Sequence, residues 1–260
     1  MTQADFWSNN PCGVDGELSQ VIGQRYRVEP WLPRELRTIP VGLGKYLEVG
    51  CGQGVDSFYI CARLYTDDAY TAIDYSEESV KRAGDYVGEA DAIFGLKVTP
   101  QFSRGDALNL DLQEDTFDFV YSMGVIHHTP NPQQGIDEVW RVLKPGGRTK
   151  IFLYRRNSLK VGVAKFLRLL QWISDKVLFQ DRIIYKLMSK TKKGFFGSMF
   201  LECFGVPWMA WFTQGELRTM FGKFSSVEIQ PYGFNLPKLS GKEIGGYNQF
   251  GYFYMIDATK

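Results

Sequence analysis

The stretch that decides the fold is Leu47-Glu48-Val49-Gly50-Cys51-Gly52-Gln53-Gly54, a glycine-rich turn after a short apolar strand over residues 45–49. Glycine has no Cβ, so these positions let the backbone turn tightly and approach a ligand closely. The helix expected over residues 55–64 begins at the same place with free backbone N–H groups. Such a loop on its own is as often a packing device as a binding site.

Strands and helices alternate after this turn. Further strands are expected over residues 69–73, 98–103, 117–122, 148–154, 226–229 and 252–256, and helices are expected after Ser76, Asn131 and Thr213. This alternation predicts βαβ units and a parallel sheet. Residues 5–40 contain four prolines and are expected to be irregular.

Two aspartates stand at the ends of predicted strands. Asp74 follows Gly54 by twenty residues, and a carboxylate there can accept both hydroxyls of a ribose. Asp106 lies in Gly105-Asp106-Ala107, where it can accept from an adenine amino group while the Ala107 N–H donates to a ring nitrogen. Each aspartate could instead be an ordinary turn residue, but their order after the glycine loop favours a nucleoside site.

Glycine spacing separates two nucleoside cofactors. A dinucleotide fingerprint, G-x-G-x-x-G, would need glycine at position 55, which is Val55. The pattern is E-x-G-x-G-x-G instead. It favours S-adenosylmethionine over NAD, because S-adenosylmethionine has no pyrophosphate to seat on the helix.

Five motifs in this order resemble the class I, Rossmann-like, S-adenosylmethionine-dependent methyltransferases. They are residues 48–54, Asp74, Asp106, the strand over 117–122 and the turn over 143–148. Residues 122–130, Ser-Met-Gly-Val-Ile-His-His-Thr-Pro, are similar to a segment of small-molecule methyltransferases of the ubiquinone-biosynthesis type. Residues 1–40 resemble one bacterial subgroup more loosely.

The resemblance implies an α/β, doubly wound, seven-stranded sheet with the last strand antiparallel, helices on both faces and a helical lid after the fifth strand. It divides the chain into an N-terminal cap (1–43), a cofactor-binding core (44–154), a lid insertion (155–212) and the end of the sheet (213–260). S-adenosylhomocysteine would be the product. The implied cofactor-binding residues are Glu48, Gly50, Cys51, Gly52, Gly54, Asp74, Tyr75, Asp106, Ala107 and Met123.

The chain holds two histidines, His127 and His128, at the carboxyl end of the fourth predicted strand. Ligands of open α/β sheets sit at that edge, and histidine titrates near neutral pH, so one of them could take a proton from a hydroxyl or amine acceptor. Alternatively, both pack the loop. Arg25 and Tyr26 could reach the cofactor's carboxylate from the cap, or be an ordinary surface pair. No zinc-ligand spacing is present, and no metal is expected.

The charge of the chain is uneven. Thirty basic and 29 acidic residues give a net charge of +1, which argues against a dedicated nucleic-acid binder. Residues 155–193 contain eleven basic and two acidic residues, so this segment carries +9 and the rest of the chain −8.

Apolar residues of the same segment fall at helical spacing: Val163, Phe166, Leu167, Leu170 and Ile173. We expect a helical lid whose apolar face forms the acceptor pocket. A membrane-surface patch, or a site for an anionic acceptor or RNA, are the alternatives. The aromatic residues of 195–212 favour a bulky or planar acceptor.

The sequence therefore predicts methyl transfer to oxygen, nitrogen or carbon of a small, bulky or apolar acceptor. A non-catalytic S-adenosylmethionine-binding module, and an RNA or protein methyltransferase, are the alternatives. The four cysteines form no C-x-x-C pair, residues 1–7 do not resemble a signal peptide, and no run approaches ~18 apolar residues. We expect a cytoplasmic monomer or homodimer.

Overall fold

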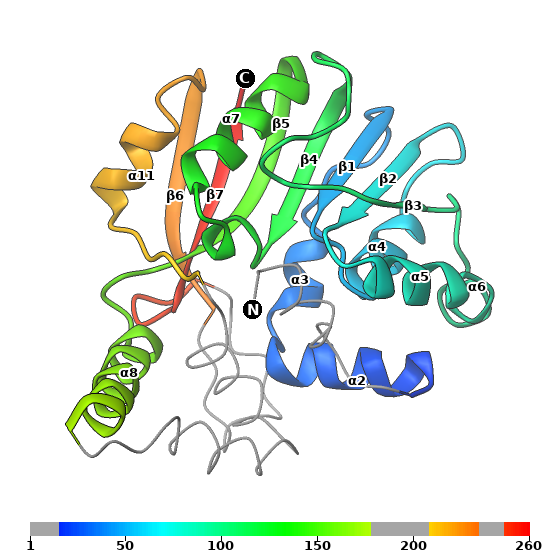
Figure 1. The fold of residues 1–260 in the computed structure, drawn as a ribbon. Coiled ribbons are helices and arrows are strands. Elements are labelled where there is room, and N and C mark those ends of the chain that lie inside the picture. Colours follow the sequence, from blue (N-terminus) through cyan, green and yellow to red (C-terminus); the bar gives the residue numbers. More distant parts are fainter. Residues whose placement is uncertain (1–15, 178–207, 234–246) are drawn as a thin grey trace.

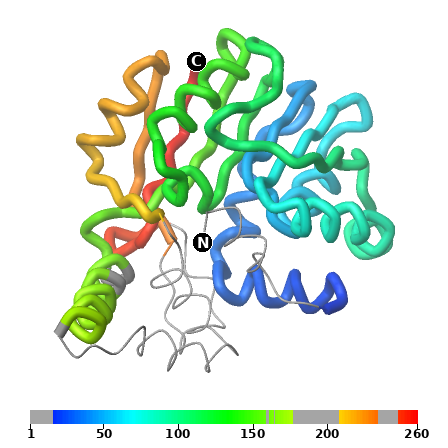
Figure 2. The backbone as a smooth tube through the Cα atoms, viewed as in Figure 1, coloured from blue at the N-terminus to red at the C-terminus, as the bar shows by residue number. Residues whose placement is uncertain are grey.

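The computed structural model describes residues 16–177, 208–233 and 247–260 (Figures 1 and 2). At its centre is a seven-stranded sheet with the order β3-β2-β1-β4-β5-β7-β6. The strands are β1 (Lys45–Val49), β2 (Ala69–Asp74), β3 (Gln101–Arg104), β4 (Phe117–Met123), β5 (Leu143–Tyr154), β6 (Ser226–Tyr232) and β7 (Phe253–Thr259). Strands β1 to β5 pair in parallel, and β7 runs antiparallel to both neighbours. The predicted fold class is confirmed.

Successive side chains of β1 point into two core layers, one on each face of the sheet. Tyr46 packs in a cluster with residues of α3 (Leu32–Leu36) and α4 (Val55–Cys61). Leu47 and Val49 point to the other face and pack with residues of α7 (Pro132–Val142) and α11 (Gln214–Met220). Successive side chains of a strand face opposite sides, so the sheet is covered on both faces by helices.

Helix starts follow the predicted capping residues. Ser76 caps α5 (Glu77–Asp85) by accepting from the Ser79 N–H, and Asn131 caps α7 with Pro132 in the first turn. Thr213 and Glu216 form the expected capping box of α11. A further helix, α6 (Val87–Phe94), follows α5, and the short 3-10 helix η1 (Ile126–His128) follows β4.

The region expected to be irregular contains two helices, α2 (Leu18–Val28) and α3. The prolines are compatible with helices here. Pro30 lies between the two helices, and Pro33 lies in the first turn of α3, where the backbone N–H has no helical partner. Buried Leu32 and Leu36 join the same core cluster as strand residues, which ties this segment to the sheet. Residues 1–15 lie outside the described part of the chain.

The described part of the predicted insertion is mainly α8 (Leu159–Val177), which stands below the sheet at one side (Figure 1). Of the expected apolar face, Val163, Leu167, Leu170 and Ile173 are half-buried, whereas Phe166 is exposed. The helical theme and aromatic residues expected over 178–207 lie outside the described residues. Among the helices that are described, none is long and apolar enough to cross a bilayer.

Candidate functional site

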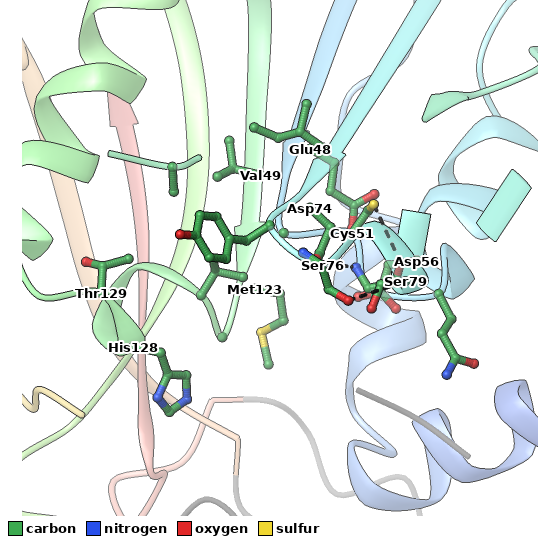
Figure 3. Close-up of a pocket in the computed structure, with 18 of the residues that line it drawn as sticks. Glu48, Val49, Cys51, Asp56, Asp74, Ser76, Ser79, Met123, His128 and Thr129 are labelled. Carbon is green, nitrogen blue, oxygen red and sulfur yellow. Dashed lines mark hydrogen bonds between the residues drawn. The ribbon is translucent and has the colours of Figure 1, made fainter. Parts of the chain in front are cut away.

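A cavity of about 390 Å³ opens at the carboxyl ends of β1, β2 and β4. The strand order reverses between β1 and β4, and open α/β sheets bind their ligands at such a switch point. In Figure 3, acidic and hydroxyl side chains lie on the β1–β2 side, His128 and Thr129 lie on the opposite side, and Met123 lies between them. The cavity can therefore hold a polar ligand at the β1–β2 end and a second, less polar ligand at the His128 end.

The glycine loop is held in a shape that only glycine tolerates at its ends. Gly50 has a φ of +86°, and a Cβ there would come within 2.0 Å of a Val125 methyl. Gly54 has a φ of +82°, and its Cβ would meet the Phe102 ring at 2.9 Å. Gly50, Cys51 and Gly52 line the cavity, whereas Gly54 caps α4 behind the wall. Gly50 and Gly52 thus let backbone atoms form part of the cavity wall, whereas Gly54 allows the loop to pack against Phe102.

Asp74 lies on the cavity wall at the end of β2. Its Oδ2 accepts from the Gly52 N–H at 2.8 Å, and its Oδ1 accepts from the Ser76 N–H at 2.9 Å. Burial raises the pKa of the carboxyl, while these backbone donors act in the opposite direction. Each oxygen still has lone-pair capacity for one further donor, which suits two vicinal hydroxyls.

Residues after β2 and β3 form the neighbouring wall. Tyr75, Asp106 and Ala107, which the resemblance nominates for cofactor binding, all line the cavity. The Asp106 carboxylate accepts from the Leu108 N–H at 2.9 Å, which fixes it in a tight turn. The Arg104 guanidinium lies 5.9 Å from the centre of the Tyr75 ring. This wall combines a flat aromatic surface with an acceptor, as a nucleobase requires.

A buried acidic pair lies beneath the glycine loop. Glu48 accepts from the hydroxyls of Ser57 and Tyr70, and burial together with the charge of Asp56 raises its pKa to about 7. Asp56 is bound by the Arg25 guanidinium, with Nη2–Oδ2 at 2.6 Å and Nε–Oδ1 at 3.2 Å. Glu48, Asp56 and Arg25 all line the cavity. Arg25 therefore reaches the site, with an aspartate partner that the sequence did not indicate.

Tyr26 is absent from the cavity wall, unlike its neighbour Arg25. Consecutive residues of a helix point about 100° apart, and Tyr26 turns toward Tyr59, with the ring centres 6.1 Å apart. Its hydroxyl is buried. The expectation that Tyr26 contacts a ligand in this cavity finds no support in its position.

Gln53 is a cavity residue that the sequence analysis passed over. Its side chain is 3% exposed, and neither the amide nitrogen nor the amide oxygen has a hydrogen-bond partner. An unpaired buried amide is costly, so such a group needs an explanation. A ligand in the cavity would supply both a donor and an acceptor. Its position inside the glycine loop was the available signal, but the pattern counts that position as variable.

The two histidines point in different directions. His128 lines the cavity, and its Nδ1 lies 3.3 Å from the Trp208 carbonyl oxygen. His127 is fully buried behind it, with its ring 3.9 Å from that of Tyr154 and 4.3 Å from that of His128. Only His128 is placed to meet a ligand in the cavity.

Aromatic residues surround this end of the cavity. Tyr154, Trp208 and Phe253 line it, and the rings of Tyr154 and Phe253 stack 5.0 Å apart. Within the described residues of the 155–212 segment, Trp208 is the one that reaches the wall. None of the α8 side chains that the structure describes lines the cavity, so this part of the predicted lid does not form the wall; residues 178–207 of the lid lie outside the described residues. The described residues include no cluster of three or more metal-ligating side chains.

Comparison with known proteins identifies this architecture. Residues 47–151 match the family model described as a methyltransferase domain. The chain is 31% identical over 138 residues to a phosphatidylethanolamine N-methyltransferase of Cereibacter sphaeroides, covering 51% of this chain and 64% of that protein. It is 31% identical over 133 residues to the chloroplastic tocopherol O-methyltransferase of Arabidopsis thaliana, covering 51% and 36%. The match thus spans less than two thirds of each of these relatives.

A solved structure extends the likeness beyond the matched domain. An S-adenosylmethionine-dependent methyltransferase from Thermotoga maritima aligns with 98% of this chain and 99% of its own, with a TM-score of 0.60 and 17% identity. At that identity the comparison concerns the fold alone. Residues 47–151 therefore form a methyltransferase domain, and the chain has the fold of the class I, S-adenosylmethionine-dependent methyltransferases.

Proposed function

We propose that this protein transfers the methyl group of S-adenosylmethionine to a small, apolar, lipid-like acceptor. The observation that carries the proposal is one continuous cavity with a nucleoside-type wall at one end and an aromatic wall with a histidine at the other. The acceptor class is further supported by the curated relatives, whose printed names include phosphatidylethanolamine and tocopherol.

The residues of the first wall fit the cofactor. Asp74 would accept the ribose hydroxyls, and Asp106 with Ala107 would bind the adenine. Gln53 supplies the strongest test of fit, because its unpaired amide offers one donor and one acceptor to a zwitterionic amino acid group. Arg25 and Asp56 line the cavity as a charge pair that could face the same group.

The protein's contribution to catalysis would be placement. When bound, S-adenosylmethionine supplies a methyl group on a positively charged sulfur, which is already an excellent leaving group. The acceptor atom has to be held in line with that bond, ~3–3.5 Å from the methyl carbon. Met123, Tyr154 and Phe253 bound the space in which an apolar acceptor would be confined.

His128 would take a proton when the acceptor atom carries one. A proton on its Nδ1 donated to the Trp208 carbonyl leaves the lone pair on Nε2, the nitrogen that a base uses. His127 would act indirectly, because its ring packs at a tilt against both His128 and Tyr154 and so fixes the His128 ring. Methylation at oxygen or nitrogen would need this base, whereas an acceptor without a proton would not.

The test is radioactive transfer. The protein is incubated with S-adenosyl-[methyl-³H]methionine and a total lipid extract, and label in the organic phase is compared with label in the aqueous phase. Label in the organic phase, together with release of S-adenosylhomocysteine, supports the proposal. Binding of S-adenosylmethionine by calorimetry without transfer to any extract would instead favour a non-catalytic binding module.

The cytoplasm remains the proposed compartment. The two described cysteines, Cys51 and Cys61, are buried free thiols, as expected in a reducing environment. Oligomeric state stays a prediction, which size-exclusion chromatography with light scattering would decide.

A further inference from the structure

One face of α8 carries large apolar side chains in solvent. Phe166 is 58% exposed, Leu169 is 52% exposed and Trp172 is 57% exposed. The three lie three residues apart, so they follow each other along one side of the helix. Their neighbours Leu167, Leu170 and Ile173 are half-buried. Monomeric proteins rarely place three such residues together in water without a partner.

Lysines are interleaved with this apolar row. Lys165 and Lys176 are exposed on the same side of α8, and the sequence segment that contains α8, residues 155–193, has a net charge of +9, against −8 for the rest of the chain. Aromatic and aliphatic residues among lysines are typical of a helix that lies in the interface of an anionic bilayer. Long lysine stems can keep the charge at the headgroups while neighbouring apolar groups sink deeper.

The apolar row lies beside the mouth of the cavity. Lys165 of α8 contacts the Trp211 ring, with its Nζ 5.0 Å from the ring centre. Trp208, three residues earlier, is 54% exposed and also lines the cavity. In Figure 1, α8 and the start of the segment leading to α11 lie at the same end of the sheet. The exposed face of α8 is therefore close to the segment that carries the exposed, cavity-lining Trp208.

We propose that α8 is a docking helix for anionic lipid bilayers. Phe166, Leu169 and Trp172 enter the interface, while Lys165 and Lys176 contact the lipid headgroups. Docking would bring the cavity mouth at Trp208 to the bilayer, from which a lipid-like acceptor could enter. This inference rests on the proposed acceptor class, but the docking itself is measured without methyl transfer.

The experiment is vesicle sedimentation of the full chain, with vesicles of phosphatidylcholine alone or mixed with phosphatidylglycerol. The first variant combines Phe166→Ser, Leu169→Ser and Trp172→Ser. The second combines Lys165→Glu and Lys176→Glu, and it keeps the test valid if the first does not fold. The matched control is Ile93→Ser, which replaces an exposed apolar residue of α6 far along the chain from the basic segment.

We expect the parent chain and Ile93→Ser to sediment with anionic vesicles, and less so as salt is raised. The lysine variant should lose roughly tenfold or more in binding, since each charge near an anionic surface is worth about fivefold. The apolar variant should lose a similar factor or more. Affinity for S-adenosylhomocysteine should be unchanged in all variants, so failure of docking is distinguishable from failure of the cofactor site.

Five results would overturn the inference. The parent chain does not sediment, or the apolar variant sediments as well as the parent. The apolar variant unfolds at a lower temperature, which would mean that this face is packed inside the folded protein. The apolar variant converts a dimer to a monomer, which would make the face a contact between two copies. Finally, the lysine variant loses RNA binding while vesicles bind neither protein, which would assign the charge to RNA.

Discussion

Replacing Asp74 with alanine is expected to weaken the binding of S-adenosylhomocysteine by roughly 10²–10⁴-fold. Each Asp74 oxygen already accepts one backbone N–H, at 2.8 and 2.9 Å, so each can accept one ribose hydroxyl in addition. A hydrogen bond to a charged acceptor contributes about 1.5–3 kcal/mol, so two of them contribute roughly 3–6 kcal/mol. The two freed N–H groups border the cavity, where water can replace their acceptor.

Calorimetry with two ligands separates the ribose contacts from a shift of the glycine loop. The 2′,3′-dideoxy analogue of S-adenosylhomocysteine lacks both hydroxyls. The parent chain should therefore prefer the natural ligand strongly, whereas Asp74→Ala should bind the two equally. Asp67→Ala is the matched control, because Asp67 is an exposed aspartate in the turn that precedes the same strand, away from Asp74 at its end. Thermal unfolding of each variant checks that the fold persists.

Two results would refute this reasoning. If Asp74→Ala bound S-adenosylhomocysteine within about threefold of the parent, worth less than about 1 kcal/mol, the carboxylate would not hold the ribose. If the variant kept the parent's preference for the natural ligand over the dideoxy analogue, the hydroxyls would be recognised by another group. Either outcome would move the nucleoside away from the end of β2.

Four other perturbations have defined outcomes. Burial raises the pKa of Glu48 to about 7, so the stability that its protonated form contributes is present below about pH 4.5 and is lost as the pH rises through about 7. In urea unfolding, the free energy of unfolding of Glu48→Gln should therefore exceed that of the parent by roughly 3 kcal/mol near pH 8 and by little near pH 4.5. Gly50→Ala should lower the free energy of unfolding by roughly 2–4 kcal/mol in the same assay, because the new Cβ meets a positive φ and a Val125 methyl at 2.0 Å. An unchanged free energy of unfolding would show that the loop tolerates a side chain there. Gln53→Leu should stabilise the ligand-free chain by about 1 kcal/mol yet weaken S-adenosylhomocysteine about tenfold, and a loss of both would show that the amide is structural. His128→Asn should lower turnover of a proton-bearing acceptor by about 10²-fold without changing cofactor affinity, and more than His127→Asn does; equal effects would remove the distinction drawn between the two rings.

Local sequence signals predicted the elements that frame the site. The glycine pattern and Asp74 depend on residues that are neighbours along the chain or one βα unit apart. The helix caps at Ser76, Asn131 and Thr213 each accept a hydrogen bond from the residue three positions ahead. Because both partners are near each other in the chain, these helix starts can be predicted from the sequence. Prolines were less informative in the N-terminal segment, because the same residue can begin a helix or interrupt one, and burial decided between them.

The sequence by itself determined which polar groups stand at the ends of the strands: a glycine turn after the first strand and an aspartate after each of the next two. Parallel strands bring their carboxyl ends to one edge of the sheet, so these groups had to lie near each other. Tertiary structure alone decided which side chains face the cavity. Arg25 meets Asp56 across thirty-one residues, Gln53 is buried without a partner, and His128 rather than His127 reaches the wall. These outcomes depend on how distant segments pack against each other, and spacing along the chain carries no record of that packing.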